Sequence, residues 1–352
     1  MPPRTMREIA LTLGLSQQTV SLALGPRAHL LRPETRERVL AAVRRAGYRP
    51  HGSALALRRN RFGCVALLQS TTGAYSYMPR LLWDGLHEVL AEHDLHLTTA
   101  RLTDEQIADE GFVPKILRQR MADGMLIDYI QDIPQRLVRQ IERYHIPSIW
   151  INARRRTDCV RPDDRAGGYQ AVEQLRALGH RRIAFYHYTW LYSAAYHYSV
   201  AERRAGYAQA MRAASLRPMV LENTGPVGRE AAMATVVDWL RKPDRPTAVI
   251  TYNERLLELL LLAAARCGLR IPEDLSIISF GGDAVDIGGQ LIATMQLPLR
   301  EMARAAVEML LAKIADPRRP LPARVLPLQY RAGNSVGPPA ENAPRKGVAR
   351  GS

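Results

Sequence analysis

The chain has 352 residues, 24% of them charged, and a formal net charge of +15 at pH 7. This length exceeds what one hydrophobic core usually holds, so we expect more than one domain. Three cysteines at positions 64, 159 and 267 are too scattered for a metal cluster and odd in number, so we expect no metal, no cofactor and a reducing compartment. No signal-peptide pattern and no membrane-spanning run is present, which predicts a cytoplasmic protein with no membrane partner.

The N-terminal segment predicts two short helices joined by a tight turn at Gly14. Ser16 is a typical N-cap for the second helix, residues 17–24, and Gln17 and Gln18 then point outward at its start. In a helix-turn-helix, this first turn reaches base edges in the major groove, where a Gln amide can pair with adenine. A small amphipathic helical pair without a DNA role is the alternative. Hydroxyl side chains suited to phosphate oxygens lie nearby, namely Thr5, Ser16, Thr19 and Ser21.

The positive charge is concentrated in this N-terminal segment. Residues 1–61 contain twelve Arg and three Glu, hence +9, which is most of the charge of the chain. Such a cluster predicts a polyanionic partner and binding that weakens with salt. RNA or an anionic membrane would also accept it, but no aromatic side chains for base stacking and no apolar helix face accompany these arginines. We therefore expect double-stranded DNA.

Residues 5–68 resemble, without a gap, the DNA-binding headpiece of the LacI/GalR family of bacterial transcriptional regulators. The resemblance is carried by TMREIALTLGLSQQTVSLAL, RPETRERVLAAVRRAGYRP and HGSALALRRNRFGCVALL. It implies a third helix, Pro33–Ala46, and a hinge helix over residues 51–61 that folds on the operator. In the hinge, the implied minor-groove residues are His51, Ala54 and Leu57, with Leu57 as the wedge that kinks the duplex.

Three positions depart from the family pattern, one of them Leu55, which stands where an arginine or polar residue is common. His51 stands where an asparagine is usual, and Leu22 stands in the reader helix where Arg or His often touches a base. Leu22 is therefore a base-reading candidate beside Gln17 and Gln18, and the two amides are the main ones.

Beyond Phe62, apolar runs alternate with amphipathic segments, which is typical of an α/β fold. We expect strands at 64–69, 95–100, 124–128, 147–151, 182–187, 219–222, 248–251 and 276–279. We expect helices at 79–92, 135–144, 166–178, 201–214, 230–240, 253–266 and 299–314. The predicted fold is an all-α helix-turn-helix headpiece followed by a two-lobed, periplasmic-binding-protein-like α/β core with doubly wound parallel sheets.

The expected division has four parts, namely a headpiece at 1–50, a hinge helix at 51–61, an effector-binding and dimerisation core at 62–333 and a tail at 334–352. In the core, we expect lobe 1 at about 62–160 and 292–320, and lobe 2 at about 161–291 and 321–333. The tail is rich in Gly, Pro and Ala and lacks apolar periodicity, so we expect it to be disordered.

The resemblance continues through the core, in DGMLI at 123–127 and PDDRAGGYQAVEQLRALGHRRIAF at 162–185. It implies that Arg203 holds ligand hydroxyls or a carboxylate by a forked pair of hydrogen bonds and that Asn253 faces the ligand. Asp163 and Asp164 are further effector-binding candidates and lie in the motif at a helix start, where carboxylates complement the helix dipole. The alternative for Arg203 is a solvated surface side chain.

The largest departure follows IPEDLSIISF, where the family usually has an acidic pair that takes ligand hydroxyls. This chain has Gly281-Gly282 instead, and Asp283 is a candidate substitute, with a flexible turn as the alternative. Aromatic side chains suited to stacking on a ligand complete the candidates, namely Tyr75, Tyr188 and Trp190. A loop that packs on itself or on a partner subunit is the alternative for these.

No catalytic pattern is found, neither a GxSxG elbow, nor a Gly-rich phosphate loop, nor HExxH, so we expect no enzyme. We predict a homodimeric, nucleoid-associated repressor that reads a palindromic operator and is controlled by a sugar-like effector between its lobes. Two alternatives stay open. One is a DNA-binding regulator without a small-molecule effector, and the other is a cytoplasmic small-molecule sensor with little DNA role.

Overall fold

The computed structural model describes residues 5–25, 27–49, 56, 60–71, 76–103, 105–106, 116, 119, 121–130, 133–187, 197–222 and 228–340. The chain divides into two compact units, Met1–Gly63 and Cys64–Ser352. Within the described residues, no helix is both long enough and apolar enough to cross a membrane.

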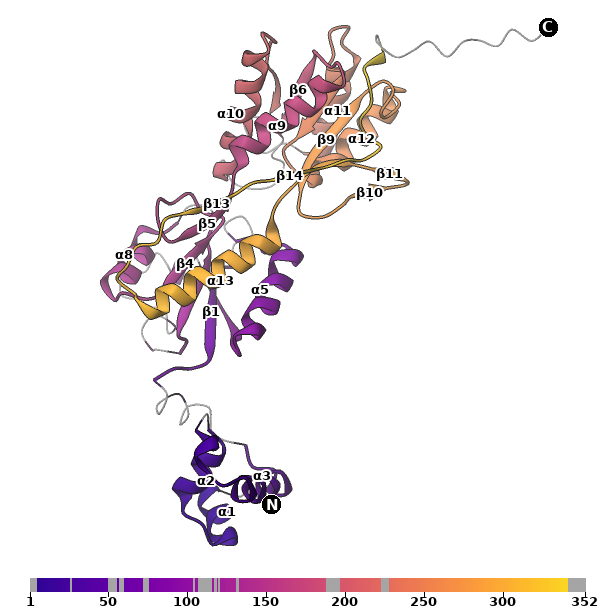
Figure 1. Cartoon of the computed structure of the whole chain (residues 1–352). Coiled ribbons are helices and arrows are strands. Elements are labelled where there is room, and N and C mark those ends of the chain that lie inside the picture. The colour runs from indigo at the N-terminus through magenta and orange to yellow at the C-terminus, as the bar shows by residue number, and fades with distance from the viewer. Residues whose placement is uncertain are drawn as a thin grey trace, which may run out of the picture. The chain divides into compact units, whose positions relative to one another are not determined.

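The N-terminal unit is helical, with α1 (Met6–Leu13), α2 (Gln17–Ala23), a short 3-10 turn η1 (Ala28–Leu30) and α3 (Pro33–Ala46) (Figure 1). Gly14 ends α1 in the left-handed conformation, φ 65°, which a glycine adopts without steric cost. Ser16 caps α2, and Pro33 and Gly47 bound α3. The small core of the unit consists of Ile9, Ala10, Val20, Ala23 and Val39. The three predicted helices are confirmed.

The first sheet of the C-terminal unit has the strand order β13-β5-β4-β3-β1-β2, and every pair in it is parallel. Its strands are β1 (Cys64–Ser70), β2 (His96–Leu102), β3 (Gly124–Asp128), β4 (Ser148–Ile151), β5 (Cys159–Pro162) and β13 (Arg324–Leu326). The apolar faces of α5 (Arg80–Glu92) and α13 (Leu299–Ala315) cover one face of this sheet, while α8 (Gln135–Arg143) contributes to a separate core on the other face. This sheet and these helices form the first lobe.

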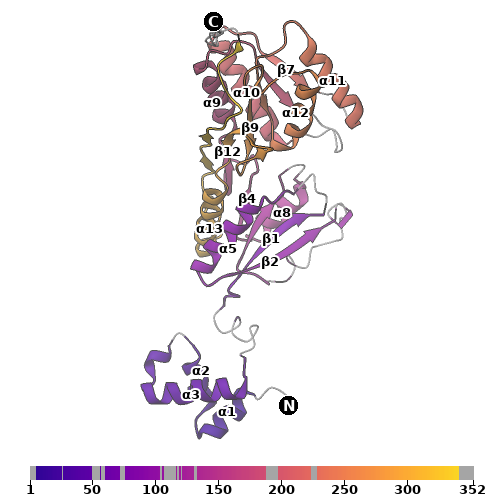
Figure 2. The ribbon, with the colours of Figure 1, turned by 90° about the vertical axis from the view of Figure 1, so that its right-hand side faces the viewer.

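The second sheet has the order β14-β12-β9-β8-β6-β7, parallel except where β14 joins β12. Its strands are β6 (Ile183–His187), β7 (Met219–Glu222), β8 (Ala248–Thr251), β9 (Ser276–Gly281), β12 (Ala293–Gln296) and β14 (Gln329–Arg331). Two helices, α9 (Asp164–Ala177) and α10 (Tyr198–Ala213), pack on one face. The other face is covered by α11 (Arg229–Arg241), η2 (Glu254–Leu256) and α12 (Leu257–Arg266) (Figure 2). A small hairpin, β10 (Asp286–Ile287) with β11 (Gln290–Leu291), lies between β9 and β12 in the chain. This sheet and its helices form the second lobe.

The chain passes between the lobes three times, after β5, after β12 and after β13. The predicted fold class is confirmed, but two of the predicted lobe limits are wrong. Residues 293–296 pair with β9 in the second lobe, so the chain returns to the first lobe only after Gln296. Residues 324–326 pair with β5 in the first lobe, whereas 321–333 had been expected entirely in the second. These strands are too short to show an apolar pattern of their own.

The beginning of the predicted disordered tail is also packed against the second lobe. Ser335 is fully buried, and its hydroxyl donates to the carbonyl of Ile277 at 2.7 Å while accepting the N–H of Ala293 at 2.8 Å. Hydrogen bonds of this kind need no apolar periodicity, which explains why the pattern did not indicate order. Residues 341–352 lie outside the described residues.

Candidate functional site

The first candidate site is the start of α2. Ser16 accepts the Thr19 N–H at 3.0 Å, and the two hydroxyl oxygens are 2.8 Å apart, so both are engaged within the cap. Gln17 and Gln18 are exposed, and Leu22 is half-buried. The amides are thus free of the core and lie where a helix-turn-helix contacts bases.

The side chains predicted to contact phosphates are partly engaged in hydrogen bonds within the N-terminal unit. Thr5 forms a capping box with Glu8, in which its hydroxyl accepts the Glu8 N–H and its own N–H donates to the Glu8 carboxylate at 2.9 Å. Ser21 is half-buried. Thr5, Ser16 and Thr19 therefore stabilise helix starts.

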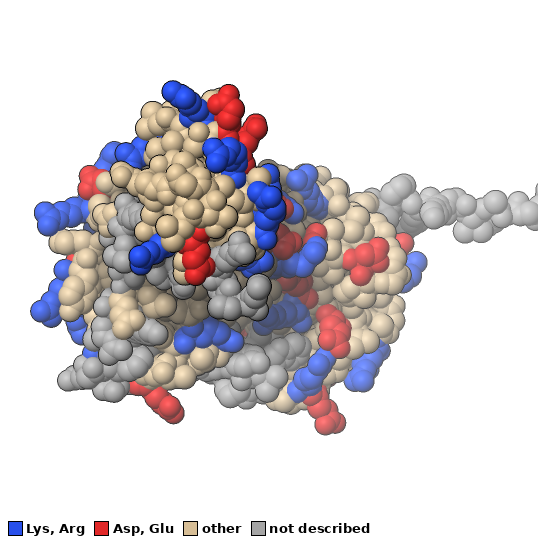
Figure 3. Space-filling model, turned by 90° about the horizontal axis from the view of Figure 1, so that it is seen from below, with Lys and Arg blue, Asp and Glu red and all other residues tan. Residues whose placement is uncertain are grey.

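Basic side chains are exposed on the surface of the N-terminal unit. All of its described arginines are exposed, namely Arg7, Arg27, Arg32, Arg36, Arg38, Arg44, Arg45, Arg49 and Arg61. The space-filling view of the whole chain from below shows separate Lys and Arg side chains among acidic and other residues (Figure 3). Exposed arginines provide the long-range attraction that DNA phosphates need.

Six predicted site residues lie outside the described residues. They are His51, Ala54 and Leu57 of the hinge, and Tyr75, Tyr188 and Trp190 of the aromatic group.

The second candidate site centres on Arg203, which projects from α10 and is only 5% exposed. Its Nε donates to Asp164 Oδ1 at 2.7 Å, and its Nη1 donates to the carbonyl of Tyr252 at 2.7 Å. The guanidinium lies 4.3 Å from the ring centroid of Phe280. Burial raises the pKa of the Asp164 carboxyl, while the Arg203 charge opposes the rise. The reading of Arg203 as a solvated surface residue is thus wrong, although it fits Arg204, which is exposed and pairs with Glu222.

Two glycines bring Arg203 and Asp164 together. A Cβ added at Gly168 would lie 2.1 Å from the carbonyl oxygen of Arg203, and one at Gly206 would lie 1.9 Å from that of Arg165. Only glycine permits such close approach of the backbones of α9 and α10. The pairing of Gly168 with Gly206 is therefore a signal that sequence reasoning missed.

Two buried acceptors near this ion pair have no hydrogen-bond partner among the described residues. They are Asp164 Oδ2 and Asn253 Oδ1, the latter at the end of β8 where η2 begins. Buried polar atoms are almost always hydrogen-bonded, so open acceptors at the carboxyl edge of a sheet favour a polar ligand.

The other two predicted carboxylates have local partners. Asp163 caps α9 by accepting the Ala166 N–H at 3.0 Å. Asp283 is exposed and accepts the N–H of Ala284 at 2.9 Å. Both bonds lie within the local backbone turn.

Asn152, directly after β4 in the first lobe, connects the two lobes. Its side-chain oxygen accepts from the Tyr198 hydroxyl at 3.0 Å, and its carbonyl lies 3.2 Å from His197 Nε2. Burial lowers the pKa of His197 to about 4, so the imidazole ring is neutral at pH 7. A neutral ring can donate a hydrogen bond from one nitrogen, here to the Asn152 carbonyl, and accept one at the other nitrogen. Through Ser199, which lies 2.6 Å from His197 Nδ1 and 2.8 Å from the Tyr252 hydroxyl, this connection reaches the Arg203 site. Sequence reasoning did not single out Asn152 or Ser199.

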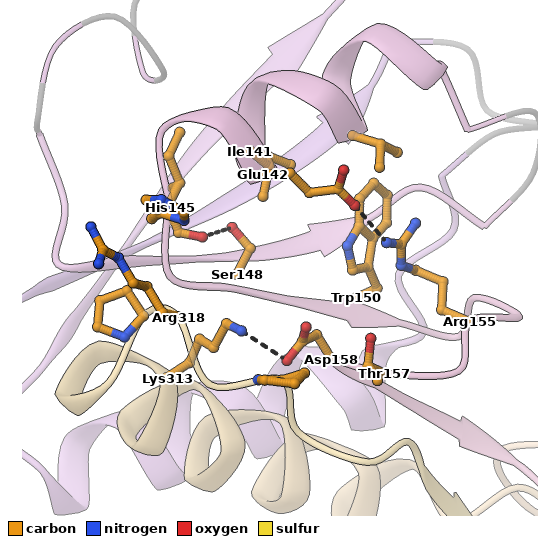
Figure 4. A pocket seen from close by; sticks show the side chains of 14 residues that line it. Ile141, Glu142, His145, Ser148, Trp150, Arg155, Thr157, Asp158, Lys313 and Arg318 are labelled. Atoms are coloured by element: carbon orange, nitrogen blue, oxygen red, sulfur yellow. Dashed lines mark hydrogen bonds and ion pairs between the residues drawn. The ribbon is translucent and has the colours of Figure 1, made fainter.

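A pocket of about 370 Å³ lies elsewhere, beside the amino ends of β4 and β5 (Figure 4). Its charges largely neutralise one another, because Lys313 pairs with Asp158 at 3.1 Å and Arg155 approaches Glu142 at 3.7 Å. Ligands of such sheets bind at the opposite, carboxyl end of the strands. Among the described residues, no group of three or more His, Cys, Asp or Glu is placed to hold a metal ion.

The family comparisons agree with this architecture. Residues 5–51 match the model of the bacterial regulatory proteins of the lacI family, and residues 172–336 match that of the periplasmic binding protein-like domain. The HTH-type transcriptional regulator RafR of Escherichia coli is 30% identical over 262 residues, which are 71% of this chain and 73% of RafR.

Solved structures agree in fold. The lac repressor dimer bound to operator and the anti-inducer ONPF superposes with a TM-score of 0.76 at 20% identity, covering 95% of this chain and 99% of the repressor chain. The complex of the transcriptional regulator CelR with cellobiose gives a TM-score of 0.62 at 21% identity, covering 94% and 99%. The helical N-terminal unit, the two-lobed core and the similarity to RafR together show that the chain belongs to the lacI family of bacterial regulatory proteins.

Proposed function

We propose that this protein is a sequence-specific DNA-binding transcriptional repressor whose operator affinity is controlled by a small molecule held between the two lobes of its core. The observation that carries the proposal is the start of α2, where Gln17 and Gln18 are exposed within a unit whose described arginines are all on the surface. The amides supply base readout, and the arginines supply attraction to phosphates.

A homodimer is part of the proposal. One reader helix covers only a half-site, and two-fold symmetry lets a pair of chains read a palindrome. The lac repressor structure similar to this chain is a dimer bound to its operator.

The proposed effector site consists of Arg203, Asn253 and Asp164. It is supported by the open acceptors of Asn253 and Asp164 and by the contacts through which Asn152 and His197 join the lobes next to Arg203. A ligand bound there would shift the equilibrium between two lobe arrangements, provided that it binds one arrangement more tightly than the other.

DNA binding is tested by selecting duplexes from a random library with the full chain and measuring affinity for the selected duplex by fluorescence anisotropy. We expect a palindromic consensus and an affinity that falls steeply with salt. Gln17→Ala and Gln18→Ala should each relax the preference at one base pair of each half-site. Enrichment of no sequence, even at low salt, would contradict the proposal and favour a small-molecule sensor.

Effector control is tested by adding sugars, sugar phosphates, nucleosides and carboxylic acids at millimolar concentration to the protein–duplex complex. A compound that changes the anisotropy should also raise the melting temperature of the free protein. If compounds of all four classes leave both signals unchanged, the protein is better described as a DNA-binding regulator without a small-molecule effector.

A further inference from the structure

The carboxyl ends of β8 and β9 hold an arrangement of Glu254 and Gly281 that the sequence does not reveal. Glu254 is the first residue of η2, and Gly281 is the last residue of the neighbouring strand β9. A Cβ added at Gly281 would lie 2.5 Å from Glu254 Oε2. The Glu254 carboxylate thus occupies the space in which a side chain at position 281 would begin.

Gly281 needs no glycine for its backbone conformation, because its φ is outside the left-handed range. The only close neighbour of the added Cβ is the Glu254 carboxylate, since the next atom, its Cδ, is 3.6 Å away. The requirement at position 281 is therefore spatial: a small residue there admits the carboxylate of Glu254.

No hydrogen bond or ion pair connects the Glu254 carboxylate to another side chain of the described residues. Burial raises the pKa of this carboxyl, and a hydrogen bond from its own backbone N–H and the positive charges of Arg255 and Arg203 oppose the rise. Arg255 directs its guanidinium over the ring of Tyr77, 4.9 Å from the centroid, and Arg203 is bonded to Asp164. Glu254 is thus a half-buried acceptor with open lone pairs, next to the open acceptor of Asn253.

We propose that the Glu254 carboxylate, seated over Gly281, accepts hydrogen bonds from the hydroxyl groups of a neutral polyhydroxyl effector and sets the specificity of the site for that class. The inference rests on the proposed effector site between the lobes. Because Arg203 is already paired with Asp164, Glu254 adds a negative charge that no cation of the described residues pairs with in an ion pair. Hydroxyl donors satisfy such a group, whereas a phosphate or carboxylate ligand is repelled by it. Asp283, which is exposed and bonded to its own turn, does not have this role.

The test uses the full-length chain with four named probes, namely ribose, glucose, galactose and cellobiose, and with glucose 6-phosphate as the anionic counterpart. Thermal melts and isothermal titration give the affinity of each probe. We expect at least one neutral sugar to bind, and Glu254→Gln to weaken it by about ten-fold to a hundred-fold, as the loss of a hydrogen bond to a charged group predicts. The matched control is Glu258→Gln, which changes an exposed glutamate of the neighbouring helix that pairs with Arg229 and should leave the affinity unchanged.

A relocation variant separates the acceptor from its present position. Glu254→Ala opens the space beside Gly281, so the double variant Glu254→Ala with Gly281→Asp places a carboxylate there from β9. We expect the double variant to recover part of the affinity that Glu254→Ala loses, which a merely structural role of Glu254 would not produce.

Four results would overturn the inference. They are equal sugar affinity in the wild type and Glu254→Gln, loss confined to Asp283→Asn, binding of glucose 6-phosphate alone, and no response of the wild type to any of the sugars. Anisotropy with the selected duplex is measured on the same samples. If the duplex binds while Glu254→Gln leaves sugar affinity unchanged, only this inference fails. If no duplex is selected or bound, the proposed regulatory function fails instead.

Discussion

Replacing Arg203 by Met tests whether the buried ion pair holds the second lobe together. Methionine keeps most of the side-chain length and the contact with Phe280, but it leaves the Asp164 carboxylate without its cation. The side chains are 6% and 0% exposed, so water cannot replace the lost partner. Coulomb's law at an effective dielectric constant of about 20 gives about 4 kcal/mol for charge centres roughly 4 Å apart. This agrees with the loss of about 3–5 kcal/mol typical when one partner of a buried pair is removed.

The assay is urea unfolding of the full chain, followed by circular dichroism at pH 7.5 and at pH 5. Without Arg203, the pKa of Asp164 rises further, so the carboxyl takes up a proton more readily at pH 5 and the loss should be smaller there. Adding Asp164→Asn to Arg203→Met should recover part of the stability at pH 7.5, because the uncompensated charge is gone. Arg204→Met, which removes an exposed pair with Glu222, is the control and should cost at most about 1 kcal/mol. The reasoning is refuted if Arg203→Met costs no more than Arg204→Met, or if the losses of the double variant simply add.

Three further predictions concern other parts of the chain. Gln18→Ala should cost roughly 1–3 kcal/mol of discrimination at one base pair, whereas Arg36→Ala should weaken binding to all duplexes alike; an unchanged base preference in the selection assay argues against Gln18 as a reader. Gly206→Ala should destabilise the protein by about 1–3 kcal/mol, because the added methyl group would meet the backbone of α9. The control Gly228→Ala, which has open space around the added methyl group, should cost under about 1 kcal/mol. Equal urea midpoints for the two variants would rule out the close contact between α9 and α10. Glu254→Gln should raise the melting temperature at neutral pH, because the folded-state pKa of Glu254 is raised and the stability contributed by its protonated form is lost as pH rises through that pKa. The difference in melting temperature between the variant and the wild type should shrink as pH falls towards the ordinary glutamate range. A difference that stays constant with pH would exclude titration of Glu254 as its cause.

Local signals predicted the helical parts well. Gly14, Ser16, Pro33 and Gly47 act on their own backbone segments, so the end of α1, the start of α2 and the bounds of α3 follow from neighbouring residues. The buried strands β3 and β8, and the less buried β7, were predicted at their observed bounds. By contrast, β5, β12, β13 and β14 and the hairpin of β10 and β11 were missed, because no marked apolar run distinguishes their residues and the strands form through hydrogen bonds to their partners.

The effector site shows the same division. Arg203 and Asn253 could be predicted because sequence motifs mark them. The burial of Arg203 and the unpartnered side-chain oxygen of Asn253, however, depend on the neighbouring elements. Asp283 was the substitute acceptor suggested by its nearness in sequence to Gly281. In the sheet, however, β9 lies between β12 and β8, and the segment that follows β8 places Glu254 rather than Asp283 against Gly281. Adjacency of strands, which decides the contact, is not a property of either segment alone.

The three passages between the lobes have a consequence for synthesis on the ribosome. The first lobe begins at β1, yet it needs α13 and β13, which emerge only after nearly all of the second lobe has been made. Most strands of the second lobe, β6 to β12, are continuous in the chain and can assemble first. The nascent chain therefore carries an unfinished first lobe for most of translation, with the apolar surface that α13 later covers still exposed. A chain stopped before α13 would leave that lobe incomplete, with an exposed apolar surface that is prone to aggregation.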